Sequence, residues 1–357
     1  MNARSGSSVW LVALMFLLAL TGGSRSQGFA GLGTNAEGFS VPRPGQAFRF
    51  PADHGPHPDF RIEWWYVTAN LQSADGAQFG VQWTLFRSAL APKTEAGWAD
   101  PQIWMGHAAL TTKDRHYSSE RLARGGVGQA GVVPEPFSAW IDSWQMKGVQ
   151  GSSGPLNNLD LTASGKDFGY QLSLSAKGPL VRQGDQGFSV KSAGGQASFY
   201  YSQPFYDVSG IVDVAGRAVP VKGKAWLDRE WSSQPLAANQ TGWDWFSLHL
   251  DTGEKIMAFR LRDEKGGYTS GNWISADGQP SALPPGSLEL TPLSSVSVGG
   301  RDVPVAWRVR IPQRSFDVTT TALNEQAWMP TRTPYWEGPI SFQGTASGRG
   351  YLEMTGY

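Results

Sequence analysis

The fold of this chain is decided by one stretch, residues 63–71, which reads EWWYVTANL. Side chains of a β-strand point alternately to its two faces. One face would carry Glu63, Trp65, Val67, Ala69 and Leu71, and the other Trp64, Tyr66, Thr68 and Asn70. The turn signal Asp75-Gly76 follows, and the alternation resumes over residues 79–87. The stretch therefore predicts a β-hairpin.

The same alternation recurs along most of the chain and predicts an all-β protein. Apolar residues at helical spacing continue for no more than about two turns. Many short alternating segments are separated by Gly, Pro, Asn and Asp, a pattern typical of antiparallel sandwiches and up-and-down barrels. A second aromatic hairpin over residues 243–262 echoes residues 64–87 about half a chain length later.

The echo predicts two related β domains in tandem, each an antiparallel barrel or sandwich. We expect a linker over residues 27–44, a first β domain over residues 45–220 and a second over residues 221–357. The junction is expected near residues 216–223, where Gly, Pro and Lys cluster.

The first 26 residues have the order of a secretory signal peptide. Arg4 precedes an apolar run over residues 9–20, and small residues follow. The run is shorter than the ~20 apolar residues that a transmembrane anchor needs. We expect cleavage after Gly23 or Ser26, and a mature protein in the periplasm or outside the cell without a transmembrane span.

Composition excludes several classes of function. The 30 basic residues balance 30 acidic ones, and no basic run offers the footprint that nucleic-acid binding requires. Without cysteine the chain has no thiol nucleophile, disulfide or cysteine-held metal cluster. We expect a monomer that uses no cofactor.

Asp228 and Glu230 are the candidate catalytic residues. On an extended strand they project from one face ~7 Å apart. If both are buried beside Trp226, their pKa values diverge, which would give one proton donor and one carboxylate. The alternative is a surface strand on which Lys224 and Arg229 neutralise the two acids.

Aromatic residues provide a candidate wall for an apolar ligand. Trp243, Trp245 and His249 share one face of a predicted strand, so a barrel interior lined by them would suit an apolar molecule. The alternative is ordinary core filling. The candidate ligand-binding residues are Trp64, Tyr66, Trp226, Trp231, Trp243, Trp245 and His249.

Residues 54–59, HGPHPD, place three potential metal ligands in a short span. Two prolines stiffen the segment, and no further ligand pattern accompanies it. We therefore expect an entry loop whose histidines pack on neighbouring tryptophans, and no metal site.

Several motifs resemble the AttH and carotenoid 1,2-hydratase-like family. They are residues 53–71, residues 226–231 (WLDREW), residues 242–246, residues 335–338 (YWEG) and residues 350–357. The resemblance implies two lipocalin-like β domains and hydrophobic or isoprenoid-like ligands. Family hydratases are thought to protonate an alkene before water captures the cation. Asp228 and Trp231 match their segment, whereas Arg229 stands where they carry histidine. The chain is most similar to the secreted branch described as predicted hydrolases.

Three functions remain open from the sequence. The first is binding of a hydrophobic small molecule between or inside the two domains, and the second is acid-catalysed hydration or hydrolysis of that molecule, up to a carotenoid 1,2-hydratase-like reaction. The third is a non-catalytic partner of an envelope export system, in which the aromatic residues only form a core.

Overall fold

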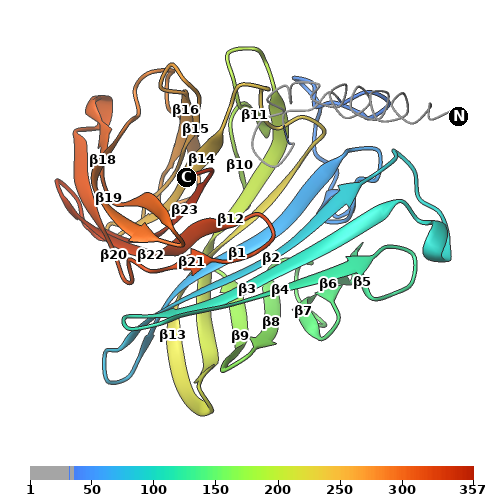
Figure 1. Ribbon diagram of the computed structural model, residues 1–357, viewed down its shortest axis with the longest axis horizontal. Coiled ribbons are helices and arrows are strands. Elements are labelled where there is room, and N and C mark those ends of the chain that lie inside the picture. Colours follow the sequence, from blue (N-terminus) through green and yellow to red (C-terminus); the bar gives the residue numbers. More distant parts are fainter. Residues whose placement is uncertain (1–31, 33–35) are drawn as a thin grey trace, which may run out of the picture.

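The protein consists of two curled antiparallel sheets that pack side by side (Figure 1). The computed structural model describes residue 32 and residues 36–357, so the predicted signal peptide lies outside the described residues. Among the described residues, no helix is long and apolar enough to cross a membrane. The prediction of an all-β protein is confirmed.

The first sheet has 13 strands and curls into a barrel. Its strands are β1 (Ile62–Ser73), β2 (Gln78–Ala89), β3 (Gln102–Thr112), β4 (His116–Arg124), β5 (Ala130–Pro134), β6 (Phe137–Ile141), β7 (Trp144–Gly148), β8 (Asn158–Gly165), β9 (Phe168–Ala176), β10 (Val181–Arg182), β11 (Phe188–Val190), β12 (Ala197–Val214) and β13 (Arg217–Ser232). The main path runs β4-β3-β2-β1-β13-β12-β9-β8-β7-β6-β5.

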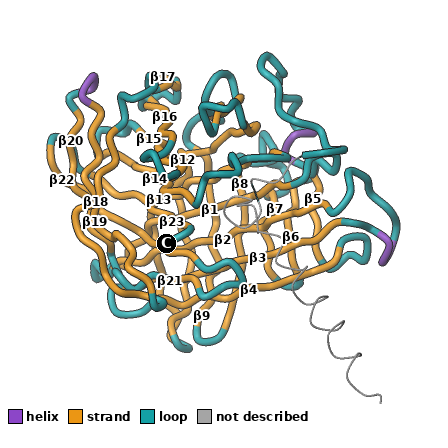
Figure 2. The backbone as a smooth tube through the Cα atoms, turned by 45° about the horizontal axis from the view of Figure 1, so that its top comes forward, coloured by secondary structure: helices purple, strands orange, loops and turns teal. Residues whose placement is uncertain are grey.

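The second sheet has ten strands and forms a half-barrel (Figure 2). Its strands are β14 (Gly242–Leu250), β15 (Lys255–Arg262), β16 (Tyr268–Ile274), β17 (Pro280–Ala282), β18 (Glu289–Val298), β19 (Arg301–Ile311), β20 (Phe316–Ala322), β21 (Trp328–Met329), β22 (Tyr335–Gly344) and β23 (Gly348–Thr355). Short 3₁₀ helices occur at η2 (Ala52–His54), η3 (Gly97–Ala99) and η4 (Pro312–Arg314).

Both predicted aromatic hairpins are present, as β1–β2 and β14–β15. The change of sheet, however, lies between Ser232 and Gly242, later than the predicted junction at residues 216–223. Ala215 and Gly216, with φ of 53° and 85°, form the tight turn between β12 and β13. The Gly/Pro/Lys cluster thus belongs to a long hairpin, and β13 completes the first sheet.

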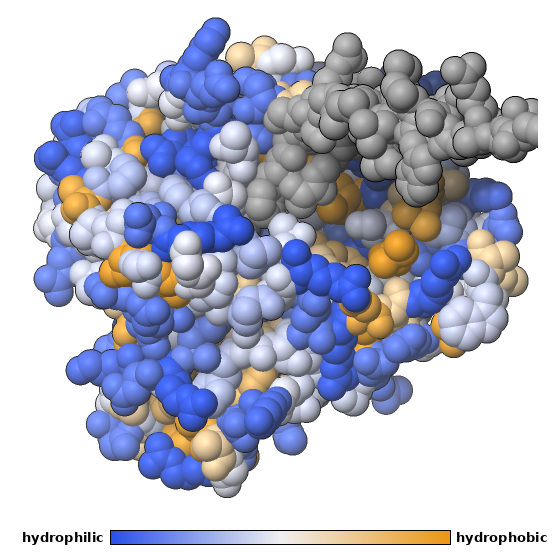
Figure 3. Space-filling view, viewed as in Figure 1, coloured by the Kyte–Doolittle hydropathy of each residue, from blue (hydrophilic) through white to orange (hydrophobic). Residues whose placement is uncertain are grey.

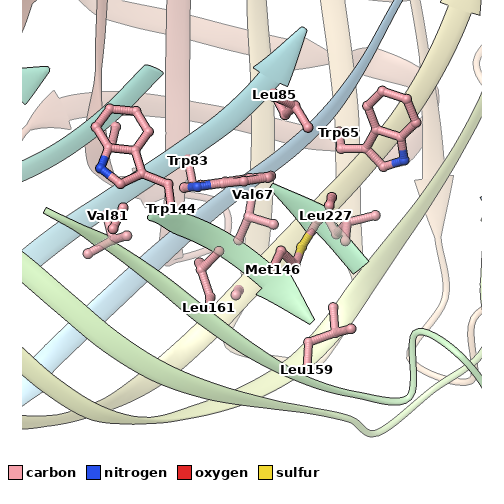
Figure 4. Close-up of a cluster of buried hydrophobic side chains, with 14 of the residues drawn as sticks. Trp65, Val67, Val81, Trp83, Leu85, Trp144, Met146, Leu159, Leu161 and Leu227 are labelled. Atoms are coloured by element: carbon pink, nitrogen blue, oxygen red, sulfur yellow. The ribbon is translucent and has the colours of Figure 1, made fainter. Parts of the chain in front are cut away.

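The barrel interior is a packed hydrophobic core (Figure 4). Trp65 and Val67 of β1 enter it together with Trp83, Trp144 and Leu227, all at most 1% exposed. The core face predicted for β1 is therefore confirmed. Side chains fill the interior of the barrel. The other face of β1 points away from this core and faces the second sheet.

The two sheets contact one another closely along β1, β2, β22 and β23. Asn70 Nδ2 donates a hydrogen bond to the Gly350 carbonyl across 3.0 Å. At Gly80, an added Cβ would lie 2.4 Å from Pro339 Cγ and 2.9 Å from the Tyr351 hydroxyl. Only a residue without a side chain fits between the sheets at this point.

Candidate functional site

A cavity of about 310 Å³ lies between the two sheets. We call it the inter-sheet cavity. Its walls are mostly apolar, and its lining comes from both sheets, from the loops that follow β11, β13 and β21, and from Leu32. The lining residues are Leu32, Ile62, Trp64, Tyr66, Thr84, Phe86, Ser88, Met105, His107, Lys191, Tyr200, Asp228, Glu230, Pro235, Leu236, Trp243, Trp245, Phe259, Leu261, Thr333, Tyr335, Glu353 and Thr355.

Strand register aligns a row of polar side chains on the barrel wall of this cavity. Asp228 of β13 is paired with Tyr66 of β1, and Tyr66 with Thr84 of β2. Thr84 is paired in turn with His107 of β3, and His107 with Glu120 of β4. Directly paired residues point to the same face of an antiparallel sheet, so the barrel presents this row to the second sheet.

Asp228 is buried in the cavity wall and surrounded by hydrogen-bond donors. Its carboxylate accepts bonds from the Tyr200 hydroxyl (2.6 Å), the Ser202 hydroxyl (2.5 Å) and Trp226 Nε1 (2.6 Å). Burial raises the pKa of Asp228 to about 7; the three donors oppose this shift, and the nearby charge of Glu230 adds to it. Asp228 can therefore both accept and release a proton near neutral pH.

Glu230 also faces the cavity but is held as an ion pair. Lys191 Nζ lies 2.8 Å from its carboxylate, and the Ser198 hydroxyl donates a second bond. The alternative of a surface strand is wrong for these acids, because Lys224 pairs with Asp207 and Arg229 points into the barrel. Asp228 and Glu230 are only 2% and 5% exposed.

The second sheet supplies acids that the sequence analysis did not single out. Glu353 of β23 lines the cavity and accepts a hydrogen bond from Trp243 Nε1. Burial raises its pKa to about 7, opposed by bonds from Trp243 and Tyr66 and reinforced by the charges of Asp228 and Glu230. Cavity carboxyl groups thus come from both sheets.

Glu337 is paired with Glu353 across β22 and β23 and lies behind Tyr66. Burial and the charge of Glu353 raise its pKa well above the ordinary value, against bonds from Tyr66 and Tyr335. Both glutamates stand in motifs, YWEG and the last eight residues, that carried only the family resemblance. The sequence signal for these two glutamates was the occurrence of an acidic residue among the aromatic residues of a strand.

Four of the predicted ligand-binding residues meet in the cavity wall: Trp64, Tyr66, Trp243 and Trp245. The rings of Tyr66 and Trp245, from different sheets, lie 5.3 Å apart. Trp226 lies behind the wall, where it donates to Asp228.

Trp231 and His249 do not reach the cavity. Trp231 points to the other face of β13 and stacks on His57, with ring centroids 4.0 Å apart. His249 packs edge-on against Trp226, and burial together with the charges of Lys255 and Lys224 lowers its pKa to about 3.

In the loop over residues 54–59, one histidine packs on a tryptophan as predicted: His57 stacks on Trp231 and hydrogen bonds to Glu63 and Asp53. His54 instead stacks on Phe50, and its Nδ1 lies 2.7 Å from the Tyr201 hydroxyl. Within the described part of the chain, no three His, Cys, Asp or Glu side chains are grouped to hold a metal ion.

The fold and the site together define a class of protein: a two-sheet β protein with an apolar cavity between the sheets and titratable carboxyl groups in its wall. The AttH-like family model matches residues 41–357, and the chain belongs to this family. Comparison with curated proteins gives no match.

Solved structures with the same fold include a candidate AttH protein from Nitrosomonas europaea, at 33% identity and a TM-score of 0.79, covering 89% of this chain and 100% of that one. Kievitone hydratase from Nectria haematococca is similar at 17% identity and a TM-score of 0.66, over 89% and 98% of the two chains. CghA in complex with Sch210972 is similar at 14% identity and a TM-score of 0.54, over 90% and 97%.

Proposed function

We propose that this protein binds a hydrophobic small molecule in the inter-sheet cavity and hydrates a carbon–carbon double bond in it by acid catalysis. The observation that carries the proposal is the placement of Asp228 and Glu353 in the wall of one cavity, each contributed by a different sheet; Asp228 is 2% exposed, and Glu353 is partly buried. Their pKa values near 7 suit proton transfer at neutral pH.

Binding of an apolar molecule is supported by the lining. Trp64, Trp243, Trp245 and Phe259 offer ring faces and edges, and desolvation of such surfaces drives apolar binding. The outer surface seen in Figure 3 is mainly hydrophilic, with hydrophobic residues gathered in a hollow of that face. An apolar ligand is thus favoured over a charged one.

The hydrogen bonds support different roles for the two acids. Asp228 accepts three side-chain hydrogen bonds, which favour its ionised form and thus the role of proton acceptor. Glu353, beside Asp228 and Glu230, is the donor. The Glu353 proton moves to one alkene carbon, and the double-bond electrons form the new C–H bond. Water attacks the cationic carbon and gives its proton to Asp228, which leaves an alcohol.

The reaction class agrees with the name of one structural neighbour. Kievitone hydratase shares the fold at low sequence identity, and its name states a hydratase. In this chain, the placement of both acids in a mostly apolar cavity wall supports the same class of chemistry independently of that name.

The test combines binding with turnover. Purified protein is expected to retain an apolar ligand that solvent extraction and mass spectrometry detect, and its tryptophan fluorescence should respond to a panel of isoprenoids and lipids. Incubation of the panel in H₂¹⁸O should yield an ¹⁸O-labelled alcohol. Absence of both a retained ligand and a fluorescence response would contradict the binding proposal.

Variants then separate catalysis from binding. Asp228→Asn and Glu353→Gln should each lower turnover by roughly 10²–10⁴-fold, the usual contribution of a positioned acid or base. Glu289→Gln, which changes an exposed acid of the second sheet, is the matched control. Turnover that survives both cavity substitutions would remove these acids from the mechanism.

A further inference from the structure

A buried ion pair in the wall of the inter-sheet cavity takes no part in the proposed reaction. Lys191 Nζ lies 2.8 Å from Glu230 Oε1, and the two residues are 6% and 5% exposed. The Ser198 hydroxyl donates a hydrogen bond to the same oxygen. Both contacts fall on Oε1, whereas Glu230 Oε2 takes no hydrogen bond from the described residues. Because Glu230 lines the cavity, this second oxygen is available to a ligand.

The surroundings of Lys191 hold its ammonium group beside Glu230. Lys191 Nζ lies 4.3 Å from the ring centroid of Phe259 in the second sheet and 4.8 Å from that of Tyr200 in the first. The backbone is fixed as well, since the Lys191 carbonyl accepts a hydrogen bond from Gln240 Nε2 across 2.9 Å. A ligand therefore meets a fixed ion pair and not two mobile side chains, which lowers the entropy cost of a directed hydrogen bond.

The charges of the cavity wall disfavour ligands with an ionised group. Lys191 is the only lysine or arginine among the described residues that line the cavity, and Glu230 neutralises it. Asp228 and Glu353 add further carboxyl groups to the wall. A ligand carboxylate would be buried near these acids without an unpaired cation, and a ligand ammonium group at Glu230 would meet the Lys191 ammonium. A hydroxyl group carries no charge and can donate its proton to Glu230 Oε2.

We propose that Glu230 binds a hydroxyl group of the ligand, so that the substrate class of the inter-sheet cavity is an uncharged alkene that carries an alcohol or phenol group. The inference rests on the proposed function, since it names the substrate class for the same cavity. Lys191 acts as a positioning residue that supplies the counter-charge of Glu230. Hydrogen bonds to an ionised carboxylate are stronger than those between neutral groups, so the proton of the ligand hydroxyl should contribute strongly to affinity.

The first experiment compares ligands that share one hydrocarbon chain. The cavity volume of about 310 Å³ lies at the lower end of the ~300–1,000 Å³ usual for small-molecule sites, so short isoprenoid chains are suitable probes. Geraniol and farnesol, each with its methyl ether, amine and carboxylic acid, are titrated at pH 7 against the tryptophan fluorescence of the purified protein. The ether keeps the oxygen of the alcohol and removes only the donated proton. The alcohol should bind about 10–100-fold more tightly than the ether, and more tightly than the amine and the acid.

Variants then assign the preference to the ion pair. Glu230→Gln removes the acid that neutralises Lys191, so the carboxylic acid should gain at least about 10-fold in affinity and the alcohol should lose about 10-fold, a change of preference that a merely structural ion pair does not predict. Asp207→Asn is the matched control, because it also deprives a lysine, Lys224, of its acidic partner, but at an exposed pair outside the cavity. It should leave all affinities unchanged.

A double variant keeps the test decisive if Glu230→Gln does not fold. Lys191→Met together with Glu230→Leu replaces the ion pair by apolar side chains of similar size, a change that buried pairs commonly tolerate. Circular dichroism establishes that each variant is folded. The double variant should bind the alcohol and the ether with equal affinity.

Equal affinity of the alcohol and the ether in the unaltered protein would overturn the proposal, and so would tighter binding of the acid or the amine. A preference for the alcohol that survives in the double variant would also overturn it, because another group would then bind the hydroxyl. Binding of none of the probes would count against an apolar ligand site and thus against both proposals. Hydration is tested separately by the ¹⁸O assay, so its failure leaves the affinity ratios standing.

Discussion

At the scale of single residues, the pKa values of the cavity carboxyl groups depend on the balance between burial and nearby hydrogen-bond donors. Asp228 and Glu353 both lie in an apolar wall, which disfavours the ionised carboxylate, and both accept hydrogen bonds that favour it. The balance leaves both pKa values near 7. Two ordinary carboxyl groups thereby become groups that titrate at physiological pH.

This balance predicts a pH dependence of stability. Because the folded pKa of Glu353 lies above the unfolded one, the folded state keeps a proton that the unfolded chain has lost. The contribution of Glu353 to the free energy of unfolding is therefore full below about pH 4 and is lost as the pH rises to about 7, by roughly 1.4 kcal/mol per pH unit. In denaturant titrations at several pH values, Glu353→Gln should reduce the slope by this amount and leave the part that Asp228 contributes; an unaltered slope would refute the assignment.

A second residue-scale prediction concerns Glu63, which lies on the barrel side of β1. Its fully buried carboxylate accepts bonds from Arg87, Arg229 and the His57 backbone N–H. Glu63→Gln leaves two buried guanidinium groups without their counter-charge and should cost about 3–5 kcal/mol. Glu289→Gln removes an exposed pair with Arg310 and should cost at most about 1 kcal/mol. Equal losses in urea unfolding would contradict this account.

At the scale of elements, the two faces of β13 carry side chains of different kinds. Asp228 and Glu230 point into the inter-sheet cavity, while Leu227, Arg229 and Trp231 point into the barrel. The alternation of a strand thus places polar catalytic candidates within two residues of a hydrophobic core without mixing the two environments.

The contact between the sheets depends on Gly80 of β2. Gly80→Ala places a methyl group against the Pro339 ring, which must shift together with β22. We expect a loss of about 1–3 kcal/mol, as for other overpacked sites, and weaker binding of apolar probes. Gly169→Ala in β9 is the control, because its nearest contact would be an ordinary 3.5 Å. Similar melting temperatures for the two variants would argue against close packing at Gly80.

Sequence patterns predicted the individual strands better than the contacts between strands that lie far apart in the sequence. The period of two assigned the faces of β1 and placed Asp228 and Glu230 together on β13, since both follow from local geometry. Glu353 and Glu337 were missed because their role depends on the packing of the second sheet against Tyr66, a contact between distant parts of the chain. His249 was predicted to bind ligand because alternation shows which face of a strand a residue lies on. Alternation does not show where a neighbouring strand covers that face, and here Trp226 of β13 covers His249.

On the scale of the whole molecule, the two sheets share a buried aromatic cluster. Tyr66, Tyr200 and Trp226 of the barrel pack with Trp245 and Phe259 of the half-barrel. Each sheet also has its own core. The junction that the sequence predicted near residues 216–223 was misplaced because a hairpin turn and a domain linker share the same composition.

The shared cluster predicts one cooperative transition. Far-ultraviolet circular dichroism and tryptophan fluorescence should report coincident unfolding curves. Trp245→Ala removes the ring that contacts Tyr66 and donates to the Tyr200 hydroxyl, and should cost about 3–5 kcal/mol and separate the two curves. Trp98→Ala, at a 74% exposed residue, should change stability by less than about 0.5 kcal/mol.

The position of the cavity between the sheets affects which substitutions the cavity wall can accept during evolution. A ligand held inside a barrel competes for space with the side chains that stabilise that barrel. Here the wall residues Phe86 and Met105 belong to neither the two sheet cores nor the shared cluster, so Phe86→Leu or Met105→Val reshapes the pocket without opening a void beside Trp65 or Trp307. Selection can therefore change the shape of the cavity at these positions at little cost in folding free energy, while the carboxyl groups in its wall stay in place.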